Sequence, residues 1–245
     1  MILSRINIFI CAISLIFISC DNFFVSDEKQ PDYQCEIEMQ YCSDEEFLNQ
    51  IECITSGNEW IITYDIEGIQ KTLGPTTYSE WEYFSILDDG TFNNLEITEE
   101  EANTSTDWDI GLLRNHFRTN SGLSGPGNGG AAMIDDIWTC ESFNQLTEIP
   151  NDIIFEEDAM LDNIYQPWAH DDPDEAYIEA PGSVVLENWG EFDLDNDYVM
   201  NITNKVLFIK LSNNRYFKIW LYDYYSYNSQ SGHVQFYYDF IEESN

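Results

Sequence analysis

The chain has 245 residues, with 46 acidic and only nine basic side chains, which gives a formal net charge of −37 at pH 7. Because no basic patch is available to neutralise phosphates, the composition argues against nucleic-acid binding and against an electrostatic hold on anionic lipid. Hydrophobic residues make up 43% of the chain and aromatic residues 15%, which excludes a disordered protein and is enough for a packed core.

Residues 1–19 are predicted to be a signal peptide. Arg5 supplies the positive charge at its start, and an apolar run from Ile6 to Ile18 follows. The run is too short to cross a membrane comfortably, and it ends at Ser19-Cys20. This ending resembles a bacterial lipoprotein box, in which Cys20 becomes the lipidated first residue. An ordinary cleaved signal peptide is the alternative. Residues 20–34 are polar and acidic and are expected to form a tether.

Residues 35–57 form a cysteine-containing segment, in which a short helix is expected from Ser43 to Cys53 with Ser43 as its cap. Four cysteines remain after Cys20, and an even number in an exported protein predicts disulfides, for which three pairings exist. We expect Cys35–Cys42 to close a small loop and Cys53–Cys140 to join this segment to the hairpin that follows the glycine-rich loop. Zinc binding is the alternative, although the spacing contains no Cys-x-x-Cys.

Residues 58–245 are predicted to be one mainly β domain of antiparallel sheets and hairpins with little helix. Residues 99–105 are expected to be a solvated helical turn or loop, and residues 156–181 an irregular acidic stretch, which in a compact domain usually has a function. In the last strand Val234, Phe236, Tyr238 and Phe240 share one face. The expected strands are Trp60–Ile66, Ser79–Leu87, Trp108–Leu113 with a polar continuation to Arg118, Ala131–Ile134, Trp138–Phe143, Val206–Leu211, Arg215–Tyr224 and His233–Ile241.

A glycine-rich loop is the most distinctive feature of this domain. Five glycines fall within nine positions, between the strand that ends near Arg118 and the strand that returns through Ala131. Glycine is favoured where φ is positive or where another backbone approaches closely, so we expect a fixed loop. A flexible linker is the alternative, but linkers are usually polar on both sides and this one lies between apolar strands. The glycines are Gly122, Gly125, Gly127, Gly129 and Gly130.

Three segments of this region form a recognisable series of motifs. They read Trp108-Asp109-Ile110-Gly111, Arg118-Thr119-Asn120-Ser121-Gly122 and Gly125-Pro126-Gly127-Asn128-Gly129-Gly130-Ala131. They resemble the Trp-Asp-Ile-Ala strand, the Arg-x-Asn-x-Gly turn and the Gly-x-Gly-x-Gly-Gly-Ala loop of the HmuY-like family of haem-binding outer-membrane lipoproteins of Bacteroidetes. Weaker matches lie at residues 81–85, 189–192 and 203–210, so the resemblance covers roughly residues 78 to 241.

The resemblance implies a haem cofactor whose iron is held by two axial side chains, either histidine or methionine. The first ligand is expected in the stretch after the glycine loop, where His170 is preferred and Met160 is also a candidate. The second is expected just beyond Phe192, where Met200 is the nearest usable side chain. The alternatives are an exposed loop histidine for His170 and a core methionine for Met200.

The resemblance also implies a location and a partner. A lipoprotein of this family is expected at the outer membrane, passing haem or another porphyrin to a TonB-dependent receptor. The acidic residues Asp21, Asp27 and Glu28 resemble the surface-export signals of Bacteroidetes lipoproteins, which favours a surface-exposed domain over one that faces the periplasm.

An enzymatic function is not expected, because nucleophile-elbow, zinc-protease and P-loop motifs are all missing. His116 is expected to be a structural hydrogen bonder and His233 to be exposed. The second hypothesis is a lipoprotein of the same fold that lacks iron ligation and binds another hydrophobic molecule, calcium or a partner protein. Calcium is considered because Asp193, Asp195 and Asp197 alternate like the first ligands of a calcium loop, although glycine and glutamate are missing at the sixth and twelfth positions.

Overall fold

The structure, a computed structural model, describes residues 37–166, 177–193, 199–226 and 228–243, without the side chains of residues 135–141. It is mainly β, as the sequence predicts. In the described part of the chain, the helices are all short, and none has the length and apolar character that crossing a membrane requires.

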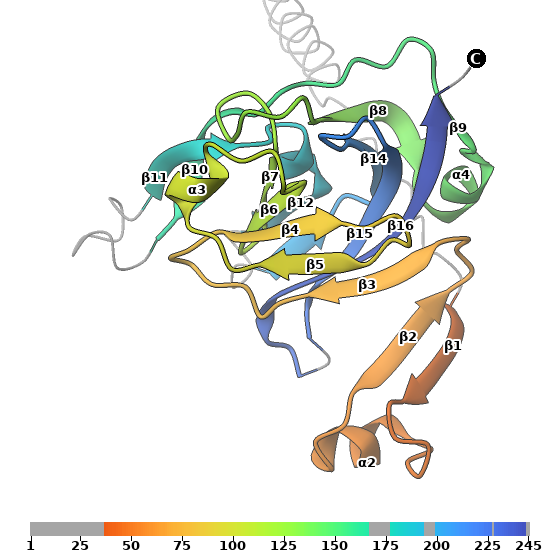
Figure 1. Cartoon of the computed structure of the whole chain (residues 1–245). Coiled ribbons are helices and arrows are strands. Elements are labelled where there is room, and N and C mark those ends of the chain that lie inside the picture. Colours follow the sequence, from red (N-terminus) through yellow and green to blue (C-terminus); the bar gives the residue numbers. More distant parts are fainter. Residues whose placement is uncertain (1–36, 167–176, 194–198, 227, 244–245) are drawn as a thin grey trace, which may run out of the picture. The chain divides into compact units, whose positions relative to one another are not determined.

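The largest sheet is built around the C-terminal meander (Figure 1). Its strands run in the order β3-β16-β15-β14-β8, and β9 adds to β16 in parallel. The Asn213-Asn214 turn joins β14 to β15, and Asn214 adopts φ 61°, which confirms the predicted hairpin. The strands are β3 Ile69–Leu73, β8 Gly130–Trp138, β9 Glu148–Ile149, β14 Lys205–Lys210, β15 Tyr216–Tyr225 and β16 Ser231–Glu243.

A second sheet has the order β5-β4-β6-β7. Its strands are β4 Glu82–Ile86, β5 Phe92–Leu95, β6 Ile110–Leu113 and β7 His116–Thr119, and α3 Glu99–Ala102 connects β5 to β6. The strand that was expected to continue from Leu113 to Arg118 is two strands and not one. The chain reverses at Arg114, which adopts φ 54°, so that β7 pairs back onto β6.

The main core is formed jointly by these two sheets. Apolar side chains of β4, β6 and β7 pack with those of β14, β15 and β16 in one continuous buried cluster. Val234, Phe236 and Tyr238 all belong to this cluster, which confirms the predicted face of the last strand. Tyr237, on the other face of the strand, packs with Phe143 in a separate cluster.

Two expectations for residues 138–181 are wrong. The segment predicted as a strand from Trp138 to Phe143 is helix α4 Thr139–Gln145. Tertiary contacts favour the helix, because the Lys218 ammonium donates to the carbonyls of Phe143 and Leu146 at its C-terminal end, where a positive charge is favourable. The stretch expected to be irregular contains a hairpin of β10 Ala159–Tyr165 and β11 Tyr177–Gly182.

The N-terminal segment forms a hairpin of β1 Ile37–Cys42 and β2 Trp60–Tyr64 around helix α2 Gln50–Thr55. The helix begins later than expected, because Asn49 and not Ser43 accepts the capping hydrogen bond. A disulfide joins Cys42 to Cys53, so the expected pairings Cys35–Cys42 and Cys53–Cys140 are wrong. The physical reason is that α2 packs against the end of β1, which places these two cysteines side by side. Cys35, the signal peptide and the tether lie outside the described residues.

Candidate functional site

The glycine-rich loop is a structural framework packed around Asn120, which confirms the expected fixed loop. The Asn120 amide donates to the carbonyls of Ser105 and Trp108, and its oxygen accepts from the Gly127 amide at 2.9 Å. A Cβ atom on Gly125 would lie 2.3 Å from the Asn120 oxygen, so this position requires glycine. The motif that carries the family resemblance therefore fixes the backbone between β7 and β8.

Arg118 ties this framework to the β10–β11 hairpin. Its side chain is fully buried; Nε donates to the carbonyl of Pro181 on β11 at 2.8 Å, and Nη1 donates to the Tyr83 hydroxyl. Nη1 also forms an ion pair with Glu99 at 2.8 Å, and the guanidinium lies over the ring of Trp81. A buried charge that is paired and hydrogen-bonded in this way fixes the relative positions of β4, β7 and β11.

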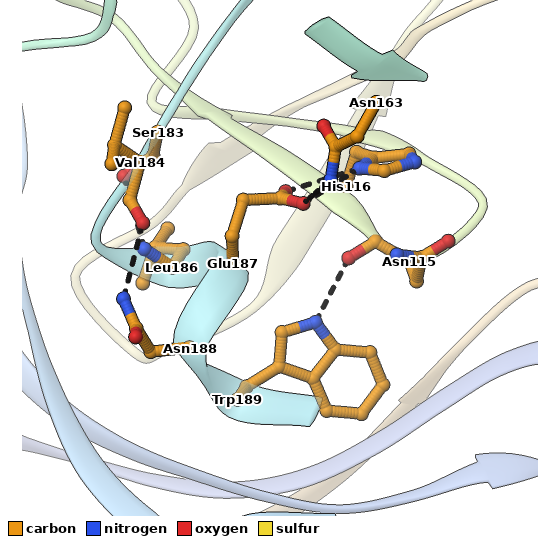
Figure 2. A network of polar contacts seen from close by, with 9 residues as sticks. All are labelled: Asn115, His116, Asn163, Ser183, Val184, Leu186, Glu187, Asn188 and Trp189. Carbon is orange, nitrogen blue, oxygen red and sulfur yellow. Dashed lines mark hydrogen bonds and ion pairs between the residues drawn. The ribbon is translucent and has the colours of Figure 1, made fainter. Parts of the chain in front are cut away.

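A second polar network joins β7 and β10 to the 3-10 helix η2 Leu186–Trp189 (Figure 2). His116 Nδ1 lies 3.0 Å from the Glu187 carboxylate, which also accepts from the Asn163 amide at 3.1 Å. His116 therefore makes a structural hydrogen bond, as expected from the sequence. The Trp189 indole donates to the carbonyl of Asn115 at 2.9 Å.

Helix η2 leads directly into a second hairpin, formed by β12 Gly190–Asp193 and β13 Val199–Ile202. Aromatic side chains support its base. Trp189 packs against Phe117 and Tyr224, and Phe192 packs edge-on against Tyr224 with 5.5 Å between ring centroids. Both hairpins whose loops the family resemblance associates with iron ligands are therefore anchored at their bases by fixed contacts.

Exposed aromatic side chains gather on the β10–β11 hairpin. Tyr165 packs against Tyr177 and against Tyr78, with ring centroids 5.3 and 6.1 Å apart. Tyr165 and Tyr177 are 37% and 49% exposed. The Arg114 guanidinium lies 4.0 Å from the centroid of the Tyr78 ring, as in a cation–π contact. Large, rigid, partly exposed rings of this kind suit contact with a flat apolar ligand.

Asp158, immediately before β10, is a buried carboxyl group that sequence reasoning missed. Its oxygens accept from the Thr119 amide at 2.8 Å and from the Thr119 hydroxyl at 2.6 Å. Burial raises the pKa of Asp158 to about 6, and the hydrogen bonds from the Thr119 amide and hydroxyl oppose this shift. The carboxyl group fixes the start of the β10–β11 hairpin against the glycine-loop framework.

The two methionines among the predicted iron ligands differ in how much of each is exposed to solvent. Met160 lies on β10 and is 50% exposed, whereas Met200 on β13 is 5% exposed and packs in the main core. The Met200 sulfur fills the space beside Gly190, where a Cβ atom would lie 2.7 Å away. His170 lies outside the described residues, as do Asp195 and Asp197 of the calcium hypothesis. Within the described part of the chain, no three His, Cys, Asp or Glu side chains come together as a metal site.

Glu187 and Asn163 were also not identified from the sequence. Neither residue belongs to a recognisable motif, because each depends on a contact made across a long separation in the chain. From the sequence alone, a single polar residue in a predicted loop gives no indication of a partner so far along the chain. His233, expected to be exposed, is half-buried in β16.

Comparisons with known proteins agree with this architecture. The family model of the HmuY protein matches residues 77–238, which include the whole second sheet, both hairpins and most of the larger sheet, but not β3. Among curated proteins no sequence matches. A structure described as a candidate HmuY-like haem-binding protein of Bacteroides vulgatus has a TM-score of 0.53 at 20% identity, covering 69% of this chain and 89% of that one.

Two further solved structures share the fold. An apo HmuY analog of Tannerella forsythia has a TM-score of 0.52 at 20% identity, covering 71% of this chain and 96% of its own. A candidate lipoprotein of Bacteroides fragilis has a TM-score of 0.52 at 20% identity, covering 69% and 88%. The family match over most of the domain, together with the shared fold, establishes that this chain belongs to the HmuY family.

Proposed function

We propose that this protein binds haem or a related porphyrin and passes it on without chemical turnover. The observation that carries the proposal is the family match, because it spans the glycine-loop framework and both hairpins, near which the resemblance implies the iron ligands. The exposed aromatic group formed by Tyr78, Tyr165 and Tyr177 supports it, since such rings can pack against the flat faces of a porphyrin.

For the iron we propose His170 and Met160 as the first ligands to test. Imidazole and thioether groups are both competent axial donors, and haem when bound would supply an iron centre for that ligation. Met160 is accessible on β10, so its sulfur can reach a ligand without unfolding a strand. Met200 would have to leave the core, where it packs against Gly190, so it ranks behind Met160.

Haem titration of variants of residues 21–245 tests this assignment. His170→Ala and Met160→Ala should each weaken binding and shift the Soret band. Met200→Leu should have little effect, because leucine retains the packing. His233→Ala and Met39→Ala are matched controls on β16 and β1, away from both hairpins. Unchanged Soret bands in His170→Ala and Met160→Ala would exclude these two side chains as ligands.

We further propose that the protein is an outer-membrane lipoprotein, anchored through Cys20 and exposed at the surface, that delivers its porphyrin to a TonB-dependent receptor. Two or three acyl chains on Cys20 would give stable attachment. Labelling of cells with a radioactive fatty acid should mark the wild-type chain and leave Cys20→Ala unmarked. Digestion of intact cells with an added protease distinguishes a surface domain, which is cleaved, from one that faces the periplasm.

The second candidate function is binding of another hydrophobic molecule by the same fold without iron ligation. The burial of Met200 favours this second function, because one of the three candidate ligand side chains is packed in the core. Metal-free protoporphyrin separates the two functions. Binding of protoporphyrin as tight as binding of haem would indicate that the aromatic faces, and not the iron ligands, hold the ring.

A further inference from the structure

An open cleft of about 470 Å³ lies between the N-terminal hairpin and the ends of β3, β15 and β16. Its volume falls within the range of small-molecule sites, roughly 300–1,000 Å³. None of its described lining residues belongs to β7, η2 or the two hairpins β10–β11 and β12–β13. The cleft is therefore separate from the elements that carry the proposed porphyrin site, and its N-terminal wall precedes the residues matched by the family.

The Cys42–Cys53 disulfide holds the N-terminal wall of the cleft. Trp60, which lines the cleft, pairs with Cys42 across the β1–β2 ladder. Gln50 lies on α2 three positions before Cys53, and the Cys53 sulfur contacts the carbonyl of Glu59 at 3.3 Å. Both cysteines are buried. This wall is consequently fixed by a covalent bond as well as by strand pairing.

The opposite wall is ordered by a chain of side-chain hydrogen bonds. The Gln70 amide donates to the Tyr222 hydroxyl at 2.7 Å, and that hydroxyl donates to the Gln235 oxygen at 3.1 Å. The Gln235 amide in turn donates to the carbonyl of Tyr225 at 2.6 Å. Aromatic and amide side chains are thus held in place before any ligand arrives, which lowers the entropy cost of binding.

Several polar groups in the lining are available to a ligand. His233 Nε2 is buried and makes no hydrogen bond, although buried polar atoms are nearly always paired. The exposed side chains of Gln50, Asn228 and Gln230 also line the cleft, and their amides face solvent and are open to a ligand. An amide offers two donors and an acceptor, and a neutral imidazole offers one of each, so this set matches a ligand with several hydroxyl groups.

The charge of the lining restricts the ligand further. No lysine or arginine is found among its described residues, while Glu59 and Asp223 are acidic, so phosphates, sulfates and carboxylates are disfavoured. Rings of Tyr41, Trp60 and Tyr64 add apolar surface beside the amides. We propose that this cleft binds a neutral saccharide, a function beyond porphyrin binding and independent of it.

The test uses the full chain in detergent, probed with neutral disaccharides in solution and with an array of neutral glycans. Binding should change the tryptophan fluorescence through Trp60 and should be measurable by calorimetry. His233→Ala and Gln230→Ala should each weaken the saccharide affinity about tenfold, because each removes one direct hydrogen bond. Asn94→Ala, an exposed amide on β5 outside the cleft, is the matched control and should bind like the wild type.

The outcomes are distinct. Saccharide binding that is lost in the cleft variants and retained in Asn94→Ala supports the proposal. Absence of binding to every neutral saccharide overturns it. Binding of choline that is lost in Glu59→Gln, with no saccharide bound, also overturns it and identifies a cation site of aromatic and acidic groups. The same cleft variants should titrate haem like the wild type, so failure of the porphyrin proposal would leave this result unaffected.

Discussion

His116 and Glu187 are 71 positions apart in sequence, yet His116 Nδ1 lies 3.0 Å from the Glu187 carboxylate. The contact joins β7 to η2, and through the Asn163 amide it also reaches β10. One carboxylate therefore connects β7 of the second sheet to β10 and to η2, which precedes β12 (Figure 2).

Removing this carboxylate should destabilise the fold. In Glu187→Ala the buried His116 ring nitrogen loses its partner, which should lower the free energy of unfolding by about 1–3 kcal/mol. Urea denaturation measures the change. Glu100→Ala, an exposed glutamate on α3, is the control and should stay within about 0.5 kcal/mol of the wild type. Equal stabilities of Glu187→Ala and Glu100→Ala would show that the contact contributes nothing.

A methyl group on Gly125 should disrupt the glycine loop. Its Cβ atom would lie 2.3 Å from the Asn120 oxygen and 2.7 Å from the Trp108 ring, so the loop must shift, at a cost of about 1–3 kcal/mol or more. Thermal unfolding measures this cost, with Gly57→Ala as the comparison. A Cβ atom on Gly57 would meet no other atom within 4 Å, so that substitution costs only the strain of its positive φ, about 1–2 kcal/mol. A Gly125→Ala protein as stable as the wild type would contradict the packing of the loop around Asn120.

The buried carboxyl of Asp158 should make stability depend on pH. Because its pKa in the folded protein, about 6, exceeds the ordinary value of 3.8, the folded state binds the proton more tightly than the unfolded state. Proton binding by Asp158 therefore stabilises the folded state fully below about pH 4, and this stabilisation is lost as the pH rises through 6. The free energy of unfolding should fall by up to about 3 kcal/mol over this range. Urea denaturation between pH 4 and pH 7.5 should show a weaker decline for Asp158→Asn than for the wild type.

Asp162→Asn serves as the control for this measurement, because Asp162 is exposed on β10. The many other acidic residues contribute equally to all three proteins, so the difference between the curves isolates Asp158. Parallel curves for the wild type and Asp158→Asn would show that the carboxyl group is not the source of the pH dependence.

The Cys42–Cys53 bond can be checked chemically. Proteolysis under non-reducing conditions followed by mass spectrometry should yield a peptide pair joined through these residues. Replacing both cysteines with serine should destabilise the N-terminal hairpin by about 3 kcal/mol, since the bond closes a loop with a sequence separation of 11. Recovery of a Cys35–Cys42 peptide instead would contradict the structure and favour the pairing expected from the sequence.

Much of the fold could be predicted from local pattern. The meander of β14, β15 and β16 has alternating apolar residues and an Asn-Asn turn, and these signals act within a few residues. The segment that became α4 was predicted wrongly because its helix depends on Lys218, far along the chain. The Cys42–Cys53 pairing was missed for a similar reason, since the packing of α2 on β1 decides it.

The candidate site could be predicted only in part. The family motif identified the glycine-loop framework, because its glycines are required by contacts with the adjacent Asn120. Glu187, Asn163 and Asp158 carry no local signal, because their roles depend on partners brought close by the completed fold. The sequence offered Met160 for the first ligand and Met200 for the second. Only the structure shows that Met160 is exposed whereas Met200 lies in the core.

The absorbance spectrum of residues 21–245 saturated with haem, recorded in the oxidised and the reduced state, tests the central claim most directly. The proposed function predicts saturable binding with a red-shifted Soret band and sharp α and β bands on reduction, as six-coordinate iron produces. A spectrum identical to that of free haem at every protein concentration would contradict the proposed function, and would mean that this chain retains the family fold without haem binding.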